Sequence, residues 1–488
     1  MPEYSGKKKT IIFTVLVSIL LIAAVTGIVA GVSSKTTSTQ PATVSGDSIR
    51  SSTAHAIVKS SCSVTLHRDL CNSMVSGVPD LTEKVKTAKD VVKLAVNKTK
   101  ERIERNYFIL KKLSDRTNLT KRQKIAFSDC LEMVTETLEE LDEVISFLKT
   151  YPVKKGLRRR VDDVITLMST ALTNRETCID GFSHDKHDKQ LRKSFIDSEI
   201  NASNMCSNSL ALIKNMTDTD MANEMRTNTR KLMDDDGSKW PEWLSIGDRK
   251  LLQSGTVTPN VTVAQDGSGD FTTISAAVAA APNRSSTRYV IGIAAGAYRE
   301  NVDIPSYKWR LMFIGAGRIL TIITANRSVA ANYTTFNSAT VAAVGEGFLA
   351  RDITFENTAG PSGQQAVALR VGSDLSAFYH CGMIAYQDTL YVHSNRQFYV
   401  NCYIAGTVDF IFGNAAAVLQ DCDIHARRPN PNQRNMNTGP GADTSNRVTW
   451  PGYRVITSAT EAQGFTAGSF IDGGNWLGDT GFPYSLGL

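Results

Sequence analysis

The hydrophobic residues follow three successive patterns along the chain. An uninterrupted apolar run fills residues 11–32, shortly after the lysines at 7–9. From residue 51 to 216, apolar residues recur at alternating steps of four and three, the period of an amphipathic helix. From residue 255 to 488, short runs rich in Val, Ile and Thr alternate with Gly and Asn turns, a pattern typical of β-strands. The chain therefore divides into an apolar N-terminal segment, a helical region and a β region.

The apolar segment 11–32 contains no charged residue and is long enough to span a bilayer. It is also longer than the core of a typical signal peptide. The lysines before it place residues 1–10 on the cytosolic side and the remainder of the chain in the lumen. We therefore predict entry into the secretory pathway, with 11–32 as a signal peptide or a membrane anchor. Residues 33–50 are rich in Ser and Thr and are predicted to be a linker.

The helical pattern is clearest at residues 121–149, where the apolar residues would form a seam along one face. The seam consists of Phe127, Leu131, Val134, Leu138, Leu141, Ile145 and Leu148. Similar faces occur at 94–113, 158–173 and 190–213. Four such helices suggest an antiparallel four-helix bundle over residues 51–216. Since this region contains no catalytic constellation, we interpret it as a structural or binding domain.

Residues 217–254 lose the helical periodicity and are predicted to link the two regions. Within this linker, Arg249 and Lys250 precede Leu251 and Leu252. A dibasic pair in a flexible stretch between domains is a candidate site of proteolytic processing.

Three cysteines reveal a repeat in the β region. The segments "FYHCGMIA", "FYVNCYIAG" and "VLQDCDIHA" place Cys381, Cys402 and Cys422 at intervals of 21 and 20 residues. This period predicts a solenoid of stacked coils, each adding a strand to parallel sheets. The alternative, an antiparallel sandwich, does not explain like residues at like intervals. In a solenoid Cys381 and Cys402 would stack within disulfide range.

Two aspartates occupy the same position on successive coils. Asp388 follows Cys381 by seven residues, and Asp409 follows Cys402 by seven. Parallel strands lie ~4.8 Å apart, so the two carboxylates are expected to sit one above the other. The free energy of ionising both carboxyl groups side by side in an apolar setting is high. One is therefore expected to stay protonated as a proton donor, and the other to act as a nucleophile or base. The side chains of Gln387 and Gln365 offer amide donors for a developing oxyanion.

The residues alone leave other functions for the aspartate pair open. Buried charges at solenoid turns can be structural and cap the strands. Glycosidases also use two carboxylates at about this separation, so the pair does not distinguish ester from glycoside hydrolysis. The sequence contains no G-x-S-x-G elbow, and its seven histidines suggest no Ser-His-Asp arrangement.

Composition adds support for export. The net charge of +6 suits an acidic partner without requiring one, and we expect no nucleic-acid partner. Eight glycosylation sequons begin at Asn97, Asn118, Asn201, Asn215, Asn260, Asn283, Asn326 and Asn332. The spacings of the eight cysteines are not those of a zinc site, so we predict disulfides and no metal. Cys62 with Cys71 would tie an N-terminal extension, and Cys130 with Cys178 would join two helices.

Long motifs in both regions resemble a known family. The β region contains "GAYRENV", "QAVALR", "YQDTLYVHSNRQF", "DFIFGNA" and "NTGPGADTSNRVTWPGYRVI". With these motifs the chain resembles the plant pectin methylesterases that carry an inhibitor-like N-terminal domain. The helices and Cys62, Cys71, Cys130 and Cys178 resemble that inhibitor domain. The resemblance implies a right-handed parallel β-helix for residues 255–488.

The resemblance also implies roles for individual residues. Asp409 matches the nucleophile, Asp388 the general acid/base and Gln387 the stabiliser of the transition state. Gln365 and Thr335 match substrate-binding positions. The implied reaction releases methanol from methyl-esterified homogalacturonan (pectin), with no metal or cofactor.

The family further implies partners and a location. The N-terminal domain would inhibit the catalytic domain within the same chain, and a processing protease would cut at residues 249–252. The enzyme would act in the cell wall after secretion, with a membrane-anchored stage if residues 11–32 are retained.

The sequence departs from the family pattern at one place. The segment "HARRPNPNQRN" runs directly into "MNTGPGADTSN" near residue 435, and the family's "LGRPW" motif is missing. Its arginine, which bonds the nucleophilic aspartate, and its tryptophan, which packs on the sugar, are therefore lost. Cys422 also lacks its family partner. We expect strongly reduced or absent activity, and the alternative function is an inactive or regulatory binding protein. A pectate lyase or polygalacturonase is disfavoured because their acid clusters differ.

Overall fold

The computed structural model describes residues 46–151, 157–182, 188–228, 257–433, 456 and 458–488. The apolar segment 11–32 and the dibasic site at 249–252 lie outside these ranges. Among the described residues, no helix combines the length and the apolar character needed to cross a membrane. Residues from His55 to Leu488 belong to one compact unit.

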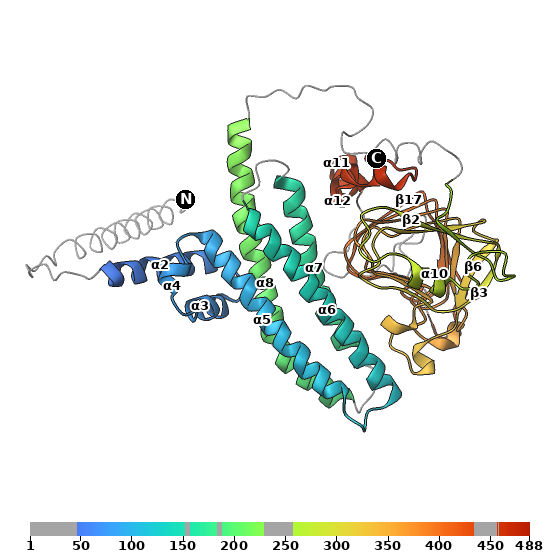
Figure 1. The fold of residues 1–488 in the computed structure, drawn as a ribbon, viewed down its shortest axis with the longest axis horizontal. Coiled ribbons are helices and arrows are strands. Elements are labelled where there is room, and N and C mark those ends of the chain that lie inside the picture. The colour runs from blue at the N-terminus through green and yellow to red at the C-terminus, as the bar shows by residue number, and fades with distance from the viewer. Residues whose placement is uncertain (1–45, 152–156, 183–187, 229–256, 434–455, 457) are drawn as a thin grey trace, which may run out of the picture. The chain divides into compact units, whose positions relative to one another are not determined.

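The helical region contains four long helices and shorter elements before them (Figure 1). Their bounds are α2 Gly46–Cys62, α3 Arg68–Ser76, α4 Leu81–Lys84, α5 Ala88–Ser114, α6 Lys121–Thr150, α7 Leu157–Asp180 and α8 Asp188–Asn228. Helix α5 contacts α6 and α8, and α7 also contacts α6 and α8. These are the contacts that a four-helix bundle would make. Helix α8 continues past residue 216, where the linker was expected, because no Gly or Pro interrupts it.

Side chains at the helix starts explain where two of these helices begin. Thr87 accepts a hydrogen bond from the backbone amide of Asp90, whose carboxylate accepts one in return from the Thr87 amide. Thr120 and Gln123 make the same reciprocal pair at the start of α6. Such capping boxes satisfy amides that the first turn leaves without partners.

The buried stripe of α6 differs from the predicted seam. Phe127, Leu141 and Leu148 are buried as expected, but Leu131 and Ile145 are only partly buried. The buried positions between them are Cys130, Met133, Thr137 and Val144. The stripe is displaced because α6 packs between α5 and α7, so its two flanks share the burial.

Two of the predicted disulfides are confirmed. Cys62 at the end of α2 is bonded to Cys71 in α3. Cys130 in α6 is bonded to Cys178 in α7, which fixes these two helices to each other. Cys206 in α8 is buried.

The β region winds into coils whose strands form three parallel sheets, as the cysteine repeat predicted (Figure 1). The seven-stranded sheet has the order β1 Val261–Val263, β2 Tyr289–Ile293, β5 Leu311–Gly315, β8 Leu349–Arg351, β11 Ser376–Tyr379, β14 Arg396–Val400, β17 Ala416–Gln420. The five-stranded sheet has the order β16 Ile411–Phe412, β13 Leu390–Val392, β10 Leu369–Val371, β7 Val341–Ala343, β4 Val302–Ile304. The six-stranded sheet has the order β18 Asp423–Ala426, β15 Tyr403–Gly406, β12 Gly382–Ile384, β9 Thr354–Asn357, β6 Thr321–Ala325, β3 Gly296–Arg299.

Like side chains stack inside the coils. The rings of Phe378 and Tyr399, on successive coils, lie parallel at 4.8 Å, and both side chains are fully buried. Helix α10 (Ile274–Ala280) packs onto the same core near the first coil. The short elements at the C-terminus, α11 (Ala459–Ala462) and α12 (Ala467–Phe470), begin a segment that packs against the seven-stranded sheet. Helix α10 and the C-terminal segment therefore add hydrophobic contacts to the repeating coils.

The predicted disulfide between Cys381 and Cys402 is wrong in this structure, although the predicted stacking is right. The strand registers align Cys381 with Cys402 and Cys402 with Cys422, yet all three are free thiols. The thiols of Cys402 and Cys422 each donate to the carbonyl two residues earlier, Val400 and Gln420. In-register parallel strands point like side chains in the same direction, which does not by itself give the sulfur–sulfur geometry of a disulfide.

We predict that Phe378→Ala lowers the free energy of unfolding by about 3–5 kcal/mol, because it empties a stacked position in the core. Urea unfolding followed by circular dichroism measures this change. The control is Phe108→Ala, whose side chain on α5 is 69% exposed and whose loss is expected to cost less than about 0.5 kcal/mol. Equal losses in both variants would contradict the stacked core.

Candidate active site

The strand register of the five-stranded sheet places the two aspartates on top of each other. Leu369 pairs with Leu390, and Leu390 pairs with Ile411, so each coil is offset by 21 residues. Asp388 and Asp409 lie two residues before Leu390 and Ile411. The amide of Asp388 donates to the carbonyl of Val408 at 3.0 Å, which extends the same register to the aspartates.

Both aspartates occupy turns with an unusual backbone. The φ angles are 62° at Asp388 and 45° at Asp409, in the left-handed region. Asp and Asn tolerate this region better than most residues because their short side chains bond locally. Each turn directs the chain into the next strand, so the aspartate stands at the start of a strand on the same edge of the sheet.

Burial makes the two carboxyl groups unequal. Asp388 is 6% exposed, whereas Asp409 is exposed. Burial, and to a lesser extent the charge of Asp409, raises the pKa of Asp388 to about 8. At neutral pH Asp388 therefore holds a proton beside the exposed side chain of Asp409. The roles of acid and nucleophile for this pair stay a prediction.

The predicted glutamines and threonine lie on neighbouring coils. Gln387 precedes Asp388, and its carbonyl accepts a hydrogen bond from the amide of Ala366 at 3.2 Å. Ala366 is therefore stacked on Gln387, and Gln365 is its neighbour in the chain. Thr335 precedes the short helix η2 (Phe336–Ser338). That helix is joined to the coil of Gln365 by a bond from the amide of Val367 to the Ser338 hydroxyl at 3.1 Å.

A row of side chains beside the aspartates was missed from the sequence. Arg370, Tyr391 and Phe412 are aligned on β10, β13 and β16. The rings of Tyr391 and Phe412 stack at 4.2 Å. Aromatic faces of this kind suit the flat face of a sugar ring. The signal was available in the sequence, because these three residues are separated by the same 21-residue interval as the aspartates.

Helices α6 and α7 contact this face of the β-helix. The hydroxyl of Thr177 lies 2.9 Å from Nε2 of His393 and 3.3 Å from the hydroxyl of Tyr391. Burial, followed by the charge of Arg370, lowers the pKa of His393 to about 3, so this imidazole is neutral. On α6, Glu132 forms an ion pair with Arg370 at 3.4 Å.

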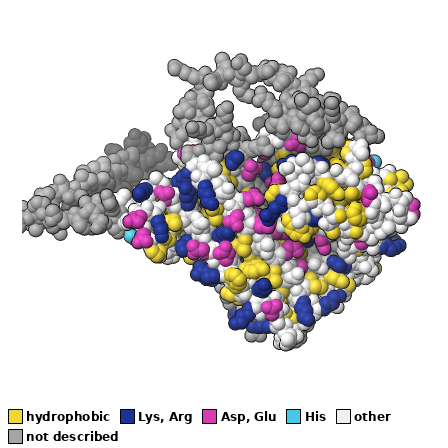
Figure 2. Space-filling model, viewed as in Figure 1, with side chains coloured by type: hydrophobic (Ala, Val, Ile, Leu, Met, Phe, Trp, Pro, Cys, Tyr) yellow, Lys and Arg dark blue, Asp and Glu magenta, His cyan; other side chains and the backbone are white. Residues whose placement is uncertain are grey.

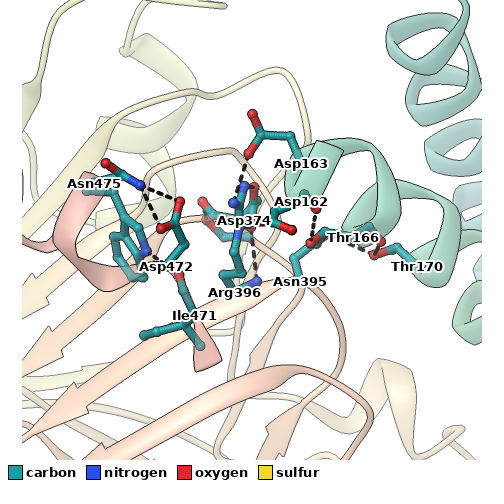
Figure 3. A network of polar contacts seen from close by, with 12 residues as sticks. Asp162, Asp163, Thr166, Thr170, Asp374, Asn395, Arg396, Ile471, Asp472 and Asn475 are labelled. Atoms are coloured by element: carbon teal, nitrogen blue, oxygen red, sulfur yellow. Dashed lines mark hydrogen bonds and ion pairs between the residues drawn. The ribbon is translucent and has the colours of Figure 1, made fainter. Parts of the chain in front are cut away.

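A second polar contact joins α7 to the β-helix (Figure 3). Arg396 donates two bonds to Asp374 of the β-helix and lies 2.8 Å from Asp163 of α7. The hydroxyl of Thr170 donates to the side-chain oxygen of Asn395 at 2.8 Å. A cavity of about 320 Å³ between the helices and the coils is bordered by Asp163, Asp374, Asn395 and Arg396.

The described residues contain no group of three or more His, Cys, Asp and Glu side chains that could hold a metal ion. On the visible face, basic side chains are interspersed with acidic ones rather than gathered in one field (Figure 2).

Comparison with known proteins agrees with this geometry. The pectinesterase family profile matches residues 260–438 and 435–474, and the plant invertase/pectin methylesterase inhibitor profile matches residues 56–212. Pectinesterase/pectinesterase inhibitor U1 of Solanum lycopersicum is 50% identical over 575 residues, which cover 100% of this chain and 98% of the relative. The chain belongs to the pectinesterase family.

Further pectinesterases align with all or part of this chain. Pectinesterase/pectinesterase inhibitor 3 of Arabidopsis thaliana is 48% identical over 593 residues, covering 100% of this chain and 98% of the relative. The solved structure of a pectin methylesterase from carrot is 54% identical, with a TM-score of 0.45, and covers 48% of this chain and 100% of that chain.

The alignments also differ from this chain in length. The two matches to the pectinesterase profile overlap at residues 435–438. The alignment with the Solanum lycopersicum relative runs over 575 residues although this chain has 488, so this relative carries residues that this chain lacks. A shortening near residue 435 stays a prediction.

We predict that Asp388→Asn stabilises the protein at about pH 8 by roughly 2–5 kcal/mol and has little effect at about pH 4. Between these values an unfolded chain ionises Asp388 while the folded chain keeps it protonated, so wild-type stability falls as pH rises. Asparagine removes this loss. Urea unfolding at both pH values tests the prediction, and a stabilisation independent of pH would contradict the raised pKa.

Proposed function

We propose that the β-helix hydrolyses the methyl esters of homogalacturonan, with Asp409 as the nucleophile and Asp388 as the acid and base. The observation that carries this proposal is the stacked pair of aspartates, of which one is exposed and the other is buried with a raised pKa. Membership of the pectinesterase family supports the ester bond, rather than the glycosidic bond, as the target.

The proposed reaction has two steps. The carboxylate of Asp409 attacks the ester carbonyl, and amide donors of Gln387 and Gln365 stabilise the oxyanion that forms. Protonated Asp388 gives its proton to the departing methanol. Asp388, now ionised, takes a proton from water, which attacks the acyl–Asp409 intermediate. Asp409 leaves as a carboxylate, and the polymer retains a free carboxyl group that ionises in solution.

The neighbouring side chains are suited to bind a sugar polymer. Tyr391 and Phe412 offer stacked rings beside the aspartates. Thr335 and Gln365 are proposed to hydrogen-bond the uronate unit under attack. Such contacts position the ester carbonyl for attack by Asp409.

We further propose that the helical region inhibits the β-helix until the chain is processed. Contacts from Thr177 to His393 and Tyr391 place α7 on the aromatic row that would bind substrate. A protease cutting at residues 249–252 would separate the two regions. The sequons and the apolar segment 11–32 support secretion to the cell wall.

The absence of the arginine and tryptophan of the family motif is expected to lower the rate of ester hydrolysis. Without that arginine, Asp409 lacks a charge partner that would favour its ionised form, so we expect slower turnover than in relatives that keep it. The alternative function, an inactive or regulatory binding protein, is not favoured by the comparisons. The chain retains both aspartates and both glutamines.

We predict that the chain, once cut in its 217–254 linker, releases methanol from highly methyl-esterified pectin. Asp409→Asn is expected to lower this rate at least about 10³-fold because it removes the nucleophile. Gln387→Ala is expected to lower it about 10²-fold through loss of an oxyanion donor. Coupled oxidation of the released methanol measures the rate.

The matched control is Asp423→Asn, on the next coil and exposed. It is expected to leave methanol release unchanged. If Asp409→Asn kept the wild-type rate, the proposed role of the pair would be wrong. If a folded, cut wild-type chain released no methanol, the proposed activity of this chain would be wrong.

We also predict that the intact chain is less active than the cut chain, by about tenfold or more, because the helices cover the aromatic row. Replacing residues 249–252 with a site for a specific protease allows both forms to be compared in one preparation. Equal rates before and after cutting would rule out inhibition by the helical region.

A further inference from the structure

Arg370 is a buried cation beside the proposed active site. It lies on β10, in register with Tyr391 and Phe412, and is 4% exposed. Its guanidinium carbon lies 3.3 Å from the centre of the Phe336 ring. Arg370 is one coil, ~4.8 Å, from Tyr391 and about three strand residues, ~10 Å, from the level of the aspartates. It is therefore placed to contact a sugar unit near the one under attack.

The charge of Arg370 is balanced by the helical region and not by the β-helix. Its ion-pair partner among the described residues is Glu132 of α6. Its Nε is buried and has no hydrogen-bond partner. Arg396 differs, because Asp374 of the β-helix already holds it with two bonds (Figure 3). Separation of the helices would leave Arg370 against Phe336 and without the carboxylate of Glu132.

Helix α6 presents a row of carboxylates to the β-helix. Its members Asp129, Glu132, Glu136, Glu139 and Glu143 recur at steps of three and four. Residues at this spacing share one face of a helix, with about 5–6 Å between neighbours. The row therefore spaces carboxyl groups regularly along a line, as does a chain of free uronate units.

Several of these carboxylates meet donors of the β-helix. Asp129 is buried and accepts hydrogen bonds from Thr334 and Asn337, in the segment that also contains Thr335. Burial raises the pKa of Asp129 to about 7. Glu139 lies 3.3 Å from Arg284. The row thus follows cationic and polar groups on the face that carries the candidate active site.

We propose that Arg370 binds the free carboxylate of an already de-esterified uronate unit, and that the carboxylate row of α6 occupies this position as a mimic of the polymer product. The substrate class rests on the proposed function. A charged carboxylate forms a strong bond with a guanidinium, whereas a methyl ester has no charge to offer. Arg370 would therefore favour attack next to a unit that has lost its ester.

Binding measurements on the intact chain test this proposal without turnover. Equilibrium dialysis compares a short de-esterified oligogalacturonide with its fully methyl-esterified counterpart. Glu132→Gln is expected to raise affinity for the de-esterified oligomer about fivefold, because it removes the competing carboxylate. Adding Arg370→Gln to that variant is expected to weaken binding of the same oligomer at least about tenfold. Arg370→Lys, which keeps the charge, is expected to restore part of the binding.

Two matched controls separate local from general charge effects. Glu101→Gln removes an exposed carboxylate of α5, and Arg299→Gln removes an exposed cation of β3 in another sheet. Neither is expected to alter binding. Hydrogen exchange measured by mass spectrometry locates the competition: the de-esterified oligomer is expected to speed exchange in residues 121–150, and the esterified one is not.

The proposal is overturned if Glu132→Gln binds the de-esterified oligomer no better than the wild type does. It is also overturned if a folded double variant with Arg370→Gln keeps its preference for that oligomer over the esterified one. Because the de-esterified ligand has no ester to hydrolyse, a chain that releases no methanol can still confirm the binding role. Conversely, methanol release without any preference for free carboxylates would reject only the role of Arg370.

Discussion

The in-register stacking of parallel coils is the constraint on which the rest of this structure depends. Backbone hydrogen bonds fix an offset of 21 residues between β10, β13 and β16. Every side chain on one coil therefore has a counterpart directly above it. The same offset stacks Asp388 on Asp409 and aligns Arg370 with Tyr391 and Phe412. A shift of one residue between coils would turn these side chains to the opposite face, and the residues of the candidate site would no longer lie together.

Stacking alone does not make two carboxyl groups differ in their affinity for a proton. The difference arises because Asp388 is buried while Asp409 is exposed. Desolvation penalises the charged form of Asp388, and the neighbouring negative charge adds to the penalty. Helices α6 and α7 also form ion pairs with this face of the β-helix. Glu132 pairs with Arg370, and Asp163 pairs with Arg396. The positive charges of these two arginines are therefore balanced while the helices remain in contact with the β-helix.

A solenoid tolerates the loss of coils better than most folds because each coil contacts mainly its neighbours. In the last described coil, β17 is only partly buried along its length and most of β18 is exposed. The C-terminal segment still packs on the seven-stranded sheet, where Trp476 and Leu477 join the core cluster. Asp388 lies on a coil with neighbours on both sides, whereas Asp409 stands just before β16, the edge strand of the five-stranded sheet.

The sequence by itself determined the repetitive fold, the positions of the aspartates and two disulfides. These follow from periodicity and motif spacing, which depend on local chain geometry and survive without knowledge of distant contacts. The disulfide predicted from the sequence between Cys381 and Cys402 was wrong, because stacking brings two thiols close without setting the geometry of a disulfide. The sequence also placed the buried stripe of α6 incorrectly, because the helix has neighbours on two sides. Only the tertiary structure decided which aspartate is buried and which carboxylate faces Arg370, since burial and ion pairing arise between segments far apart in the chain.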